Sequence, residues 1–160
     1  MPEYRQIFLN CGIPLTLLQT PGSGMISFYS FIMAGSADDS TGMEGTAHLC
    51  EHLAFSGASM AGRKELYNRI GGAGAGFNAF TRRDYSCFHF TVVKDRFASA
   101  LELLVNIIFK TGFTQSDIET EKQVVIKEIA ANNLSDDFTA QNAFYKILFP
   151  GSFGSPICGS

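Results

Sequence analysis

Three side chains that can bind and use a metal ion lie within five consecutive residues. His48, Glu51 and His52 stand in the order H-x-x-E-H inside the stretch 46–57, TAHLCEHLAFSG. If this stretch is helical, the two histidines share one face, with their Cβ atoms about 5–6 Å apart. Two imidazoles so placed can bind one Zn²⁺, and Glu51 can reach a water at the metal without being a ligand. The pattern predicts a zinc site for hydrolytic chemistry; the alternative is an ordinary amphipathic helix that carries two histidines.

A third ligand is expected on a second helix, predicted over 116–133, because a catalytic zinc commonly has three protein ligands. This helix carries Glu119, Glu121 and Glu128. Glu121 and Glu128 are seven residues apart, so they fall within about 20° of one face, about 10 Å apart along the axis. One carboxylate can bind the metal while the other holds the ring N–H of a histidine ligand. Spacing alone leaves open which carboxylate does which, and a solvated acidic helix is the alternative for both.

The remaining histidine and the cysteines are not expected to bind metal. His89 lies in a predicted strand, where a lone histidine is more often structural than a ligand. The four cysteines lack C-x-x-C spacing, so neither a disulfide framework nor a cysteine-based zinc site is predicted. Cys50 lies inside the motif but points away from its histidine face, so packing is its expected role. The glycine-rich run 71–76 lacks a P-loop lysine and a strand before it, so phosphate binding is not expected.

Composition places the chain among globular proteins of about one domain. It has 160 residues, of which 46% are hydrophobic and 17% charged. The formal charge of −3 gives no basic footprint for nucleic acid. No apolar window is long enough for a membrane span. The N-terminus lacks the pattern of a signal peptide, which predicts a cytoplasmic protein and leaves an organelle or the periplasm open.

The elements that must position the motif follow from periodicity and turn residues. Alternation predicts a hairpin of two strands, 4–10 and 14–19, and two later strands, 77–81 and 85–93. The apolar run 25–34 predicts a central strand with both faces covered. Thr46 is a candidate cap of the motif helix, although Gly45 and the acidic residues before it leave the start of the helix open. Helices are expected over 63–70 (stopped by Gly71-Gly72), 95–110 (capped by Asp95), 116–133 (with a capping box over 116–119) and 138–149.

Several segments resemble the pitrilysin/insulysin family of inverted zinc metallopeptidases, the inverzincins. This family includes mitochondrial processing peptidase and insulin-degrading enzyme. The similar segments are AGSADD at 34–39, HLCEH at 48–52, FNAFT at 77–81, ETEKQVVIKEI at 119–129 and FPGSFGSPICG at 149–159.

The resemblance implies roles for the motif residues. His48, His52 and Glu128, which stands at the family's spacing after the second histidine, would be the ligands of one Zn²⁺ per chain. Glu51 would be the general base, and Glu121 a supporting carboxylate seven residues before the third ligand. The function implied is that of a zinc endopeptidase acting on peptides or unfolded protein segments.

The resemblance also implies a substrate site and a partner. Asn78 and Ala79 would lie near the peptide substrate, beside the metal. The expected fold is α+β, an antiparallel or mixed sheet with helices packed on one face. Residues 1–160 would form a single catalytic-type domain, shorter than the family domain. Family domains usually occur in pairs, so a second domain or subunit, or a homo-oligomer, is the expected partner.

Two other functions are compatible with the residues. A non-catalytic or partner-dependent subunit could bind peptide through the same surface, although such relatives usually have a damaged H-x-x-E-H. A purely structural zinc site is a weaker alternative, because such sites usually have four protein ligands.

Overall fold

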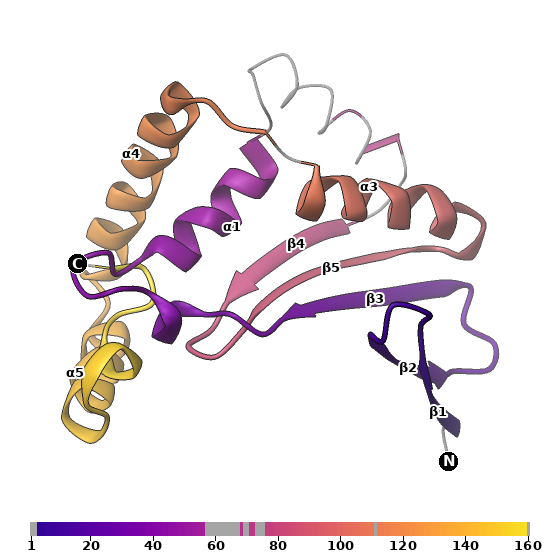
Figure 1. Cartoon of the computed structure of the whole chain (residues 1–160), viewed down its shortest axis with the longest axis horizontal. Coiled ribbons are helices and arrows are strands. Elements are labelled where there is room, and N and C mark those ends of the chain that lie inside the picture. The colour runs from indigo at the N-terminus through magenta and orange to yellow at the C-terminus, as the bar shows by residue number, and fades with distance from the viewer. Residues whose placement is uncertain (1–2, 57–67, 69–70, 73–75, 111, 160) are drawn as a thin grey trace.

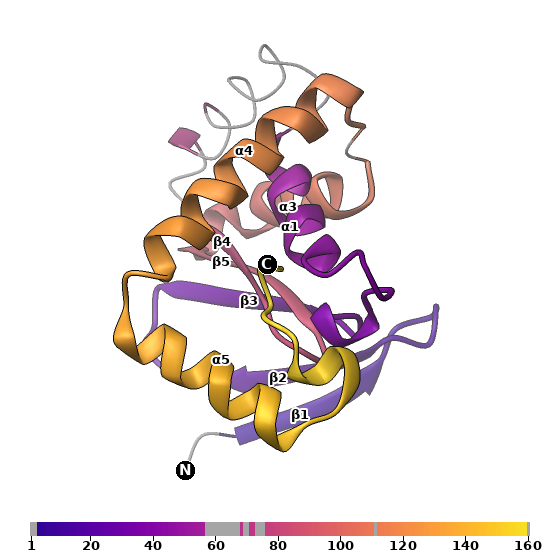
Figure 2. The same cartoon turned by 90° about the vertical axis from the view of Figure 1, so that its left-hand side faces the viewer.

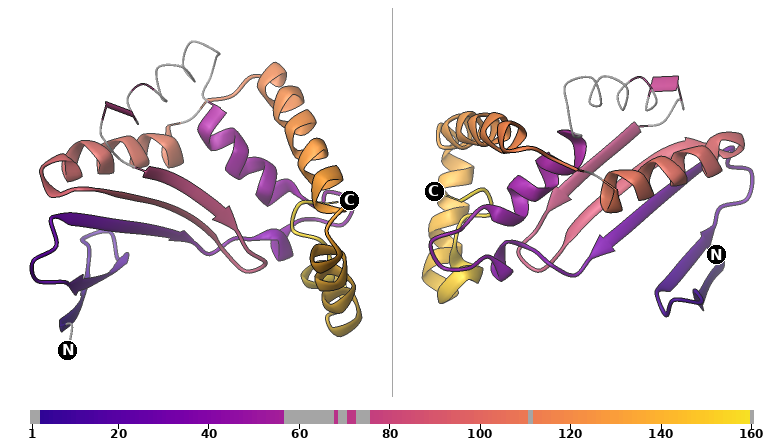
Figure 3. Two further views of the ribbon diagram at one scale, coloured as in Figure 1. Left: turned by 180° about the vertical axis from the view of Figure 1, so that it is seen from behind. Right: turned by 45° about the horizontal axis from the view of Figure 1, so that its top comes forward.

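A three-stranded antiparallel sheet with helices on one of its faces forms the body of the molecule (Figure 1). The computed structural model describes residues 3–56, 68, 71–72, 76–110 and 112–159. The sheet consists of β3 (Met25–Ile32), β4 (Gly76–Thr81) and β5 (Ser86–Val93), in the order β3-β5-β4. Seen from behind and from above, α1 (Thr46–Ser56) and α3 (Phe97–Phe109) lie over the same side of the sheet (Figure 3). The predicted α+β class, with helices on one face, is confirmed.

The prediction of a central strand over 25–34 is wrong for the described sheet, whose central strand is β5. Among the described strands, β3 pairs with β5 alone. Tyr29 and Phe31 on β3 are 51% and 57% exposed. Their rings contact His89 and Tyr85 on the face of the sheet away from the helices. An apolar run predicts burial on both faces, but here the aromatic rings on one face pack mainly against each other.

The core lies between β5 and α3. Alternate residues of β5 point toward α3 and are buried against one stripe of that helix. The cluster consists of Phe88, Phe90, Val92, Ala100, Leu103, Leu104 and Ile107. The ring of Phe55 on α1 stacks on Phe88 at 6.0 Å, which ties the end of the motif helix to this core. Burial of these side chains therefore fixes α1 against the sheet.

Helix starts differ from the predictions by small shifts. A short 3₁₀ turn, Lys94–Arg96, precedes α3, so Asp95 is not its cap. The helix α4 (Gln115–Asn132) is capped by Thr114, whose Oγ1 accepts from the Asp117 N–H while Asp117 accepts from the Thr114 N–H. The capping box therefore starts at Thr114 rather than at Ser116, because Asp117 as well as Glu can complete it.

The remaining described elements are a two-stranded hairpin, one further helix and two 3₁₀ turns. The predicted hairpin is confirmed as β1 (Glu3–Phe8) paired with β2 (Pro14–Gln19). The helix α5 (Asp136–Leu148) follows α4 and leads to a 3₁₀ turn, Gly151–Gly154. A further 3₁₀ turn, Ser36–Asp38, follows β3.

Two predicted segments fall largely outside the described residues. The helix expected over 63–70 lies there except for Asn68. The glycine-rich run 71–76 is described only at its ends, where Gly71 and Gly72 are helical rather than the end of a helix. Among the described residues, no helix combines the length and apolar character needed to cross a membrane.

Candidate metal centre

The helices α1 and α4 pack side by side and bring the two predicted halves of the site together (Figures 1 and 2). His48 is 8% exposed, and both histidines of α1 reach carboxylates of α4. Their ring centroids are 4.7 Å apart, as expected for residues four apart on a helix.

One carboxylate oxygen of α4 lies close to a ring nitrogen of each histidine of α1. The Oε2 atom of Glu128 lies 3.4 Å from Nε2 of His52 and 3.8 Å from Nε2 of His48. Two nitrogen or oxygen ligands on one tetrahedral Zn²⁺, each about 2.0–2.1 Å away, stand about 3.4 Å apart. The pair formed by His52 and Glu128 therefore already has the spacing of two zinc ligands, and His48 would need to move slightly closer to Glu128. Two imidazoles with one carboxylate are a usual donor set for this metal.

Glu121 lies at the other nitrogen of His52. Its Oε2 is 3.4 Å from His52 Nδ1, and the residue is only 5% exposed. The two carboxylates that spacing could not distinguish thus have different positions. Glu128 faces both Nε2 atoms, while Glu121 is placed to accept a hydrogen bond from the opposite side of one ring.

The electrostatics of the cluster favour a bound cation. Burial lowers the pKa of His48; His52 adds to this effect, whereas Glu128 and Glu51 oppose it. His48 is thus held toward the neutral form that metal binding requires. Its Nδ1 is buried and has no hydrogen-bond partner among the described residues. Three carboxylates surround two imidazoles here, and a divalent cation would offset their mutual repulsion.

Glu51 is held by the end of strand β4. The Oγ1 atom of Thr81, a buried residue, donates a hydrogen bond of 2.6 Å to Oε2 of Glu51. This contact joins the motif helix to the sheet and fixes one oxygen of the carboxylate. Sequence reasoning named the FNAFT segment but did not single out Thr81, although it closes that segment.

The start of α1 is held by an acidic side chain from the preceding turn. Oδ1 of Asp39 accepts from the Ala47 N–H at 2.9 Å, and Oδ2 accepts from the Gly45 N–H at 2.8 Å. The Oγ1 atom of Thr46 instead donates to the carbonyl of Met43. The prediction that Thr46 caps the helix is therefore wrong, because Asp39 satisfies the N–H groups there and complements the helix dipole.

The predicted substrate residues lie on β4, which contacts α1. Asn78 is exposed, and its Oδ1 accepts from the N–H of Ala79. Ala79 packs against the core instead. His89 pairs with Asn78 across the sheet and stacks on Tyr29 at 5.0 Å, on the face away from the helices.

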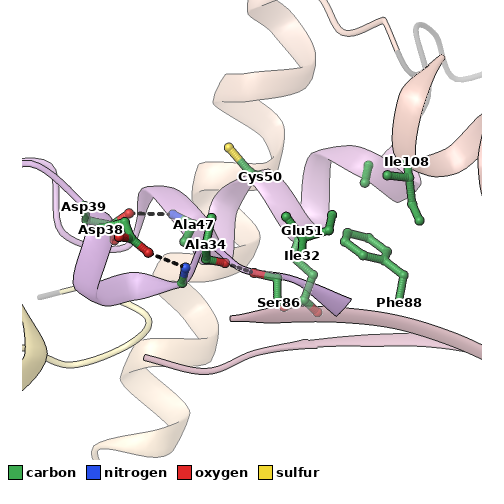
Figure 4. A pocket seen from close by; sticks show the side chains of 12 residues that line it. Ile32, Ala34, Asp38, Asp39, Ala47, Cys50, Glu51, Ser86, Phe88 and Ile108 are labelled. Atoms are coloured by element: carbon green, nitrogen blue, oxygen red, sulfur yellow. Dashed lines mark hydrogen bonds between the residues drawn. The ribbon is translucent and has the colours of Figure 1, made fainter. Parts of the chain in front are cut away.

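A cavity of about 340 Å³ lies along the sheet side of α1 (Figure 4). Glu51 and Cys50 form part of its wall, opposite Ser86 and Phe88 of β5. Cys50, which was expected to pack, is exposed. The general-base candidate thus borders both the histidine pair and a mostly apolar space.

One residue near the donors was not predicted. A ligand atom each from His48, Glu128 and Cys158 lies within 4.8 Å of the others. Burial, with the nearby carboxylates of Glu128 and Glu51, raises the pKa of the Cys158 thiol to about 11. No C-x-x-C spacing marks Cys158, and the chain separation from the motif hides its proximity.

The chain is similar to known proteins over most of its length. Residues 23–159 match the family described as Insulinase (Peptidase family M16), and the chain belongs to this family. The resemblance found in the sequence is thereby confirmed. An uncharacterized zinc protease of Bacillus subtilis, YmxG, is 28% identical over 153 residues, which cover 93% of this chain and 37% of that protein.

Solved structures share the fold. The peptidase M16 inactive domain from Pseudomonas fluorescens matches with a TM-score of 0.86 at 16% identity, over 98% of this chain and 39% of that one. Pitrilysin matches with a TM-score of 0.83 at 21% identity, over 99% of this chain and 17% of that one. The chain thus spans well under half the length of these proteins.

Proposed function

We propose that the chain carries the metal centre of a zinc endopeptidase, an inverzincin that hydrolyses peptides or unfolded protein segments. The observation that carries this proposal is the approach of Glu128 to the Nε2 atoms of both His48 and His52, beside a Glu51 that accepts a hydrogen bond from Thr81. A solvated helix would not place these groups together between two packed helices.

The two histidines and Glu128 would hold one Zn²⁺ per chain. When bound, the ion supplies the Lewis acidity that lowers the pKa of a coordinated water toward about 7. Glu121 orients His52 through Nδ1, which keeps Nε2 directed at the site. The remaining buried carboxylate charge is offset by the cation rather than left unpaired.

Glu51 would act as the general base. Thr81 donates to its Oε2, so Oε1 is the oxygen proposed to take a proton from the attacking water and return it to the leaving amine. The hydrogen bond also limits rotation of the carboxylate, so little further entropy is lost when the base is positioned for reaction.

The edge of β4 is the proposed place for the substrate. One edge of β4 pairs with β5. The strand also contacts α1, which carries Glu51, so a peptide on the other edge of β4 would lie near this glutamate. An extended peptide could add its backbone along Phe77–Thr81, past Asn78 and Ala79, with its scissile bond at the metal. A second family domain or subunit would cover the bound peptide from the opposite side.

A partner-dependent or non-catalytic subunit is the second candidate. It is favoured by a structural neighbour that is described as an inactive domain. Against it stands the complete set of motif residues.

The test compares the zinc-loaded natural chain with the variant Glu51→Gln on an unstructured fluorogenic peptide. We expect kcat/KM to fall by about 10²–10⁴-fold, with zinc content unchanged, because the base is lost but the ligands remain. The matched control is Glu119→Gln on the exposed side of α4, which should cleave at the natural rate.

Two results would count against the peptidase proposal. Cleavage by Glu51→Gln at the natural rate would contradict the role of Glu51. If the natural chain by itself holds zinc but cleaves no peptide, the result would favour the partner-dependent subunit.

A further inference from the structure

We propose that the thiol of Cys158 is a fourth protein ligand of the metal, so that the segment 155–159 closes the site in this conformation. The proposal rests on the metal site proposed above and adds to it a resting state with no open position. It concerns a residue that lies far from the motif in sequence.

The position of the thiol carries the inference. Cys158 offers its Sγ within 4.8 Å of ligand atoms from both His48 and Glu128, which are themselves the proposed ligands. His48 is buried, and its Nδ1 lacks a hydrogen-bond partner in the described part of the chain, so no hydrogen bond at that nitrogen fixes the rotation of the ring. The thiol therefore faces two of the three proposed ligands rather than an isolated side chain.

Backbone contacts hold Cys158 at this place. A Cβ on Gly45 would stand 2.6 Å from the Cys158 carbonyl oxygen, and one on Gly159 would stand 2.5 Å from the Glu44 carbonyl oxygen. Both glycines have positive φ, which lets the two backbones approach this closely. The tail thus lies directly against the turn that starts the motif helix.

A second anchor holds the preceding part of the tail. The Nε atom of Arg83 donates to the Phe153 carbonyl at 2.9 Å, and its guanidinium lies over the Tyr145 ring. Ser152 donates through its hydroxyl to the Ala37 carbonyl. These contacts fix residues 152–153 to the turn between β4 and β5 and to the turn before α1, five residues before Cys158.

The distances suit coordination after a small side-chain movement. A thiolate at about 2.3 Å and an imidazole nitrogen at about 2.0–2.1 Å on one ion stand about 3.6 Å apart. The thiol would need to approach by at most about an ångström. On binding, the S–H bond breaks, the proton passes to solvent, and the sulfur lone pair forms the bond to the metal.

Four protein ligands would change what the site can do. Structural zinc sites are four-coordinate and closed, whereas catalytic sites keep one position for water. With Cys158 bound, that position is filled, and water can enter only when the tail releases the thiol. The tail would then act as a built-in inhibitor of the proposed peptidase.

The test uses Co²⁺ as the probe, bound to the full chain in place of zinc. A sulfur ligand gives a near-ultraviolet thiolate-to-cobalt charge-transfer band. We expect this band in the natural chain and in Cys11→Ser, whose thiol lies in the exposed turn between β1 and β2. It should be absent from Cys158→Ser, with cobalt affinity reduced about ten- to a hundredfold.

A second measurement uses the natural chain only and so does not depend on the folding of a variant. Bound Zn²⁺ should slow alkylation of Cys158 by iodoacetamide, followed by peptide mass spectrometry, and leave alkylation of Cys11 unchanged. Cobalt bound with no charge-transfer band, or equal alkylation of Cys158 with and without zinc, would overturn this inference alone. A chain that binds no cobalt would overturn the metal site and this inference together.

Discussion

Glu121 provides a strong test of the two-helix site, because its proposed role depends on one contact, with Nδ1 of His52. It is 5% exposed, and its Oε2 lies 3.4 Å from Nδ1 of His52. Partners that orient ligand histidines typically contribute 10–100-fold in metal affinity, or about 1.4–2.8 kcal/mol. The variants Glu121→Gln and Glu121→Ala separate the hydrogen bond from the charge.

Glu121→Gln should weaken zinc binding by about tenfold, because the amide oxygen can still accept from His52 but the charge is lost. Glu121→Ala should approach a hundredfold, because both are lost. Zinc affinity is measured by competition with a chromophoric chelator at fixed pH, and circular dichroism of the metal-free chains checks that each variant is folded.

The control is Glu119→Gln on the same helix. Glu119 is exposed and pairs with Lys122 at 3.3 Å, so its charge is screened by solvent, and the substitution should leave zinc affinity unchanged. Natural zinc affinity in Glu121→Gln and Glu121→Ala would refute the orienting role. An equal loss in Glu119→Gln would show that only the net charge of α4 matters.

Two further predictions concern the groups that hold the site. Thr81→Val removes the hydrogen-bond donor to Glu51. Because hydrogen bonds to charged groups contribute about 1.5–3 kcal/mol, the rate of peptide cleavage should fall about 10–100-fold while zinc affinity stays unchanged. Thr81→Ser should retain most of the activity, and a natural kcat in Thr81→Val would contradict the positioning role of Thr81. Gly45→Ala should destabilise the chain by about 1–3 kcal/mol in urea unfolding, because φ is +93° and the new Cβ meets the Cys158 carbonyl. Gly12→Ala, with φ +85° but open space, is the control and should cost less; equal losses would mean that the contact with the tail contributes nothing.

The sequence was most informative where periodicity and chemistry agreed. The spacing of His48 and His52 predicted a shared face, and the seven-residue spacing of Glu121 and Glu128 predicted that both would face the same way. The structure brings all four side chains together. Each is fixed by helical geometry, which is local and therefore readable from spacing.

The division of roles between Glu121 and Glu128 was not readable from spacing. It depends on how α4 is shifted along α1, which is set by packing between residues distant in the chain. The same reason hid Thr81 and Cys158, whose contacts with the motif are made by a strand end and by the tail.

The errors in the fold also come from contacts that the local sequence pattern does not show. The apolar run 25–34 has the composition of a buried strand, yet β3 lies at an edge because strand order is decided by pairing with β5. The helix starts were displaced because Thr114 and Asp39 satisfy N–H groups that sequence reasoning assigned to Ser116 and Thr46.

The most direct test of the central claim is the zinc content of purified chains after dialysis, measured by mass spectrometry. The claim is that α1 and α4 together form one metal site through Glu128. The natural chain and Glu119→Ala should each retain about one zinc, whereas Glu128→Ala should retain almost none. A full equivalent of zinc in Glu128→Ala would contradict the two-helix site.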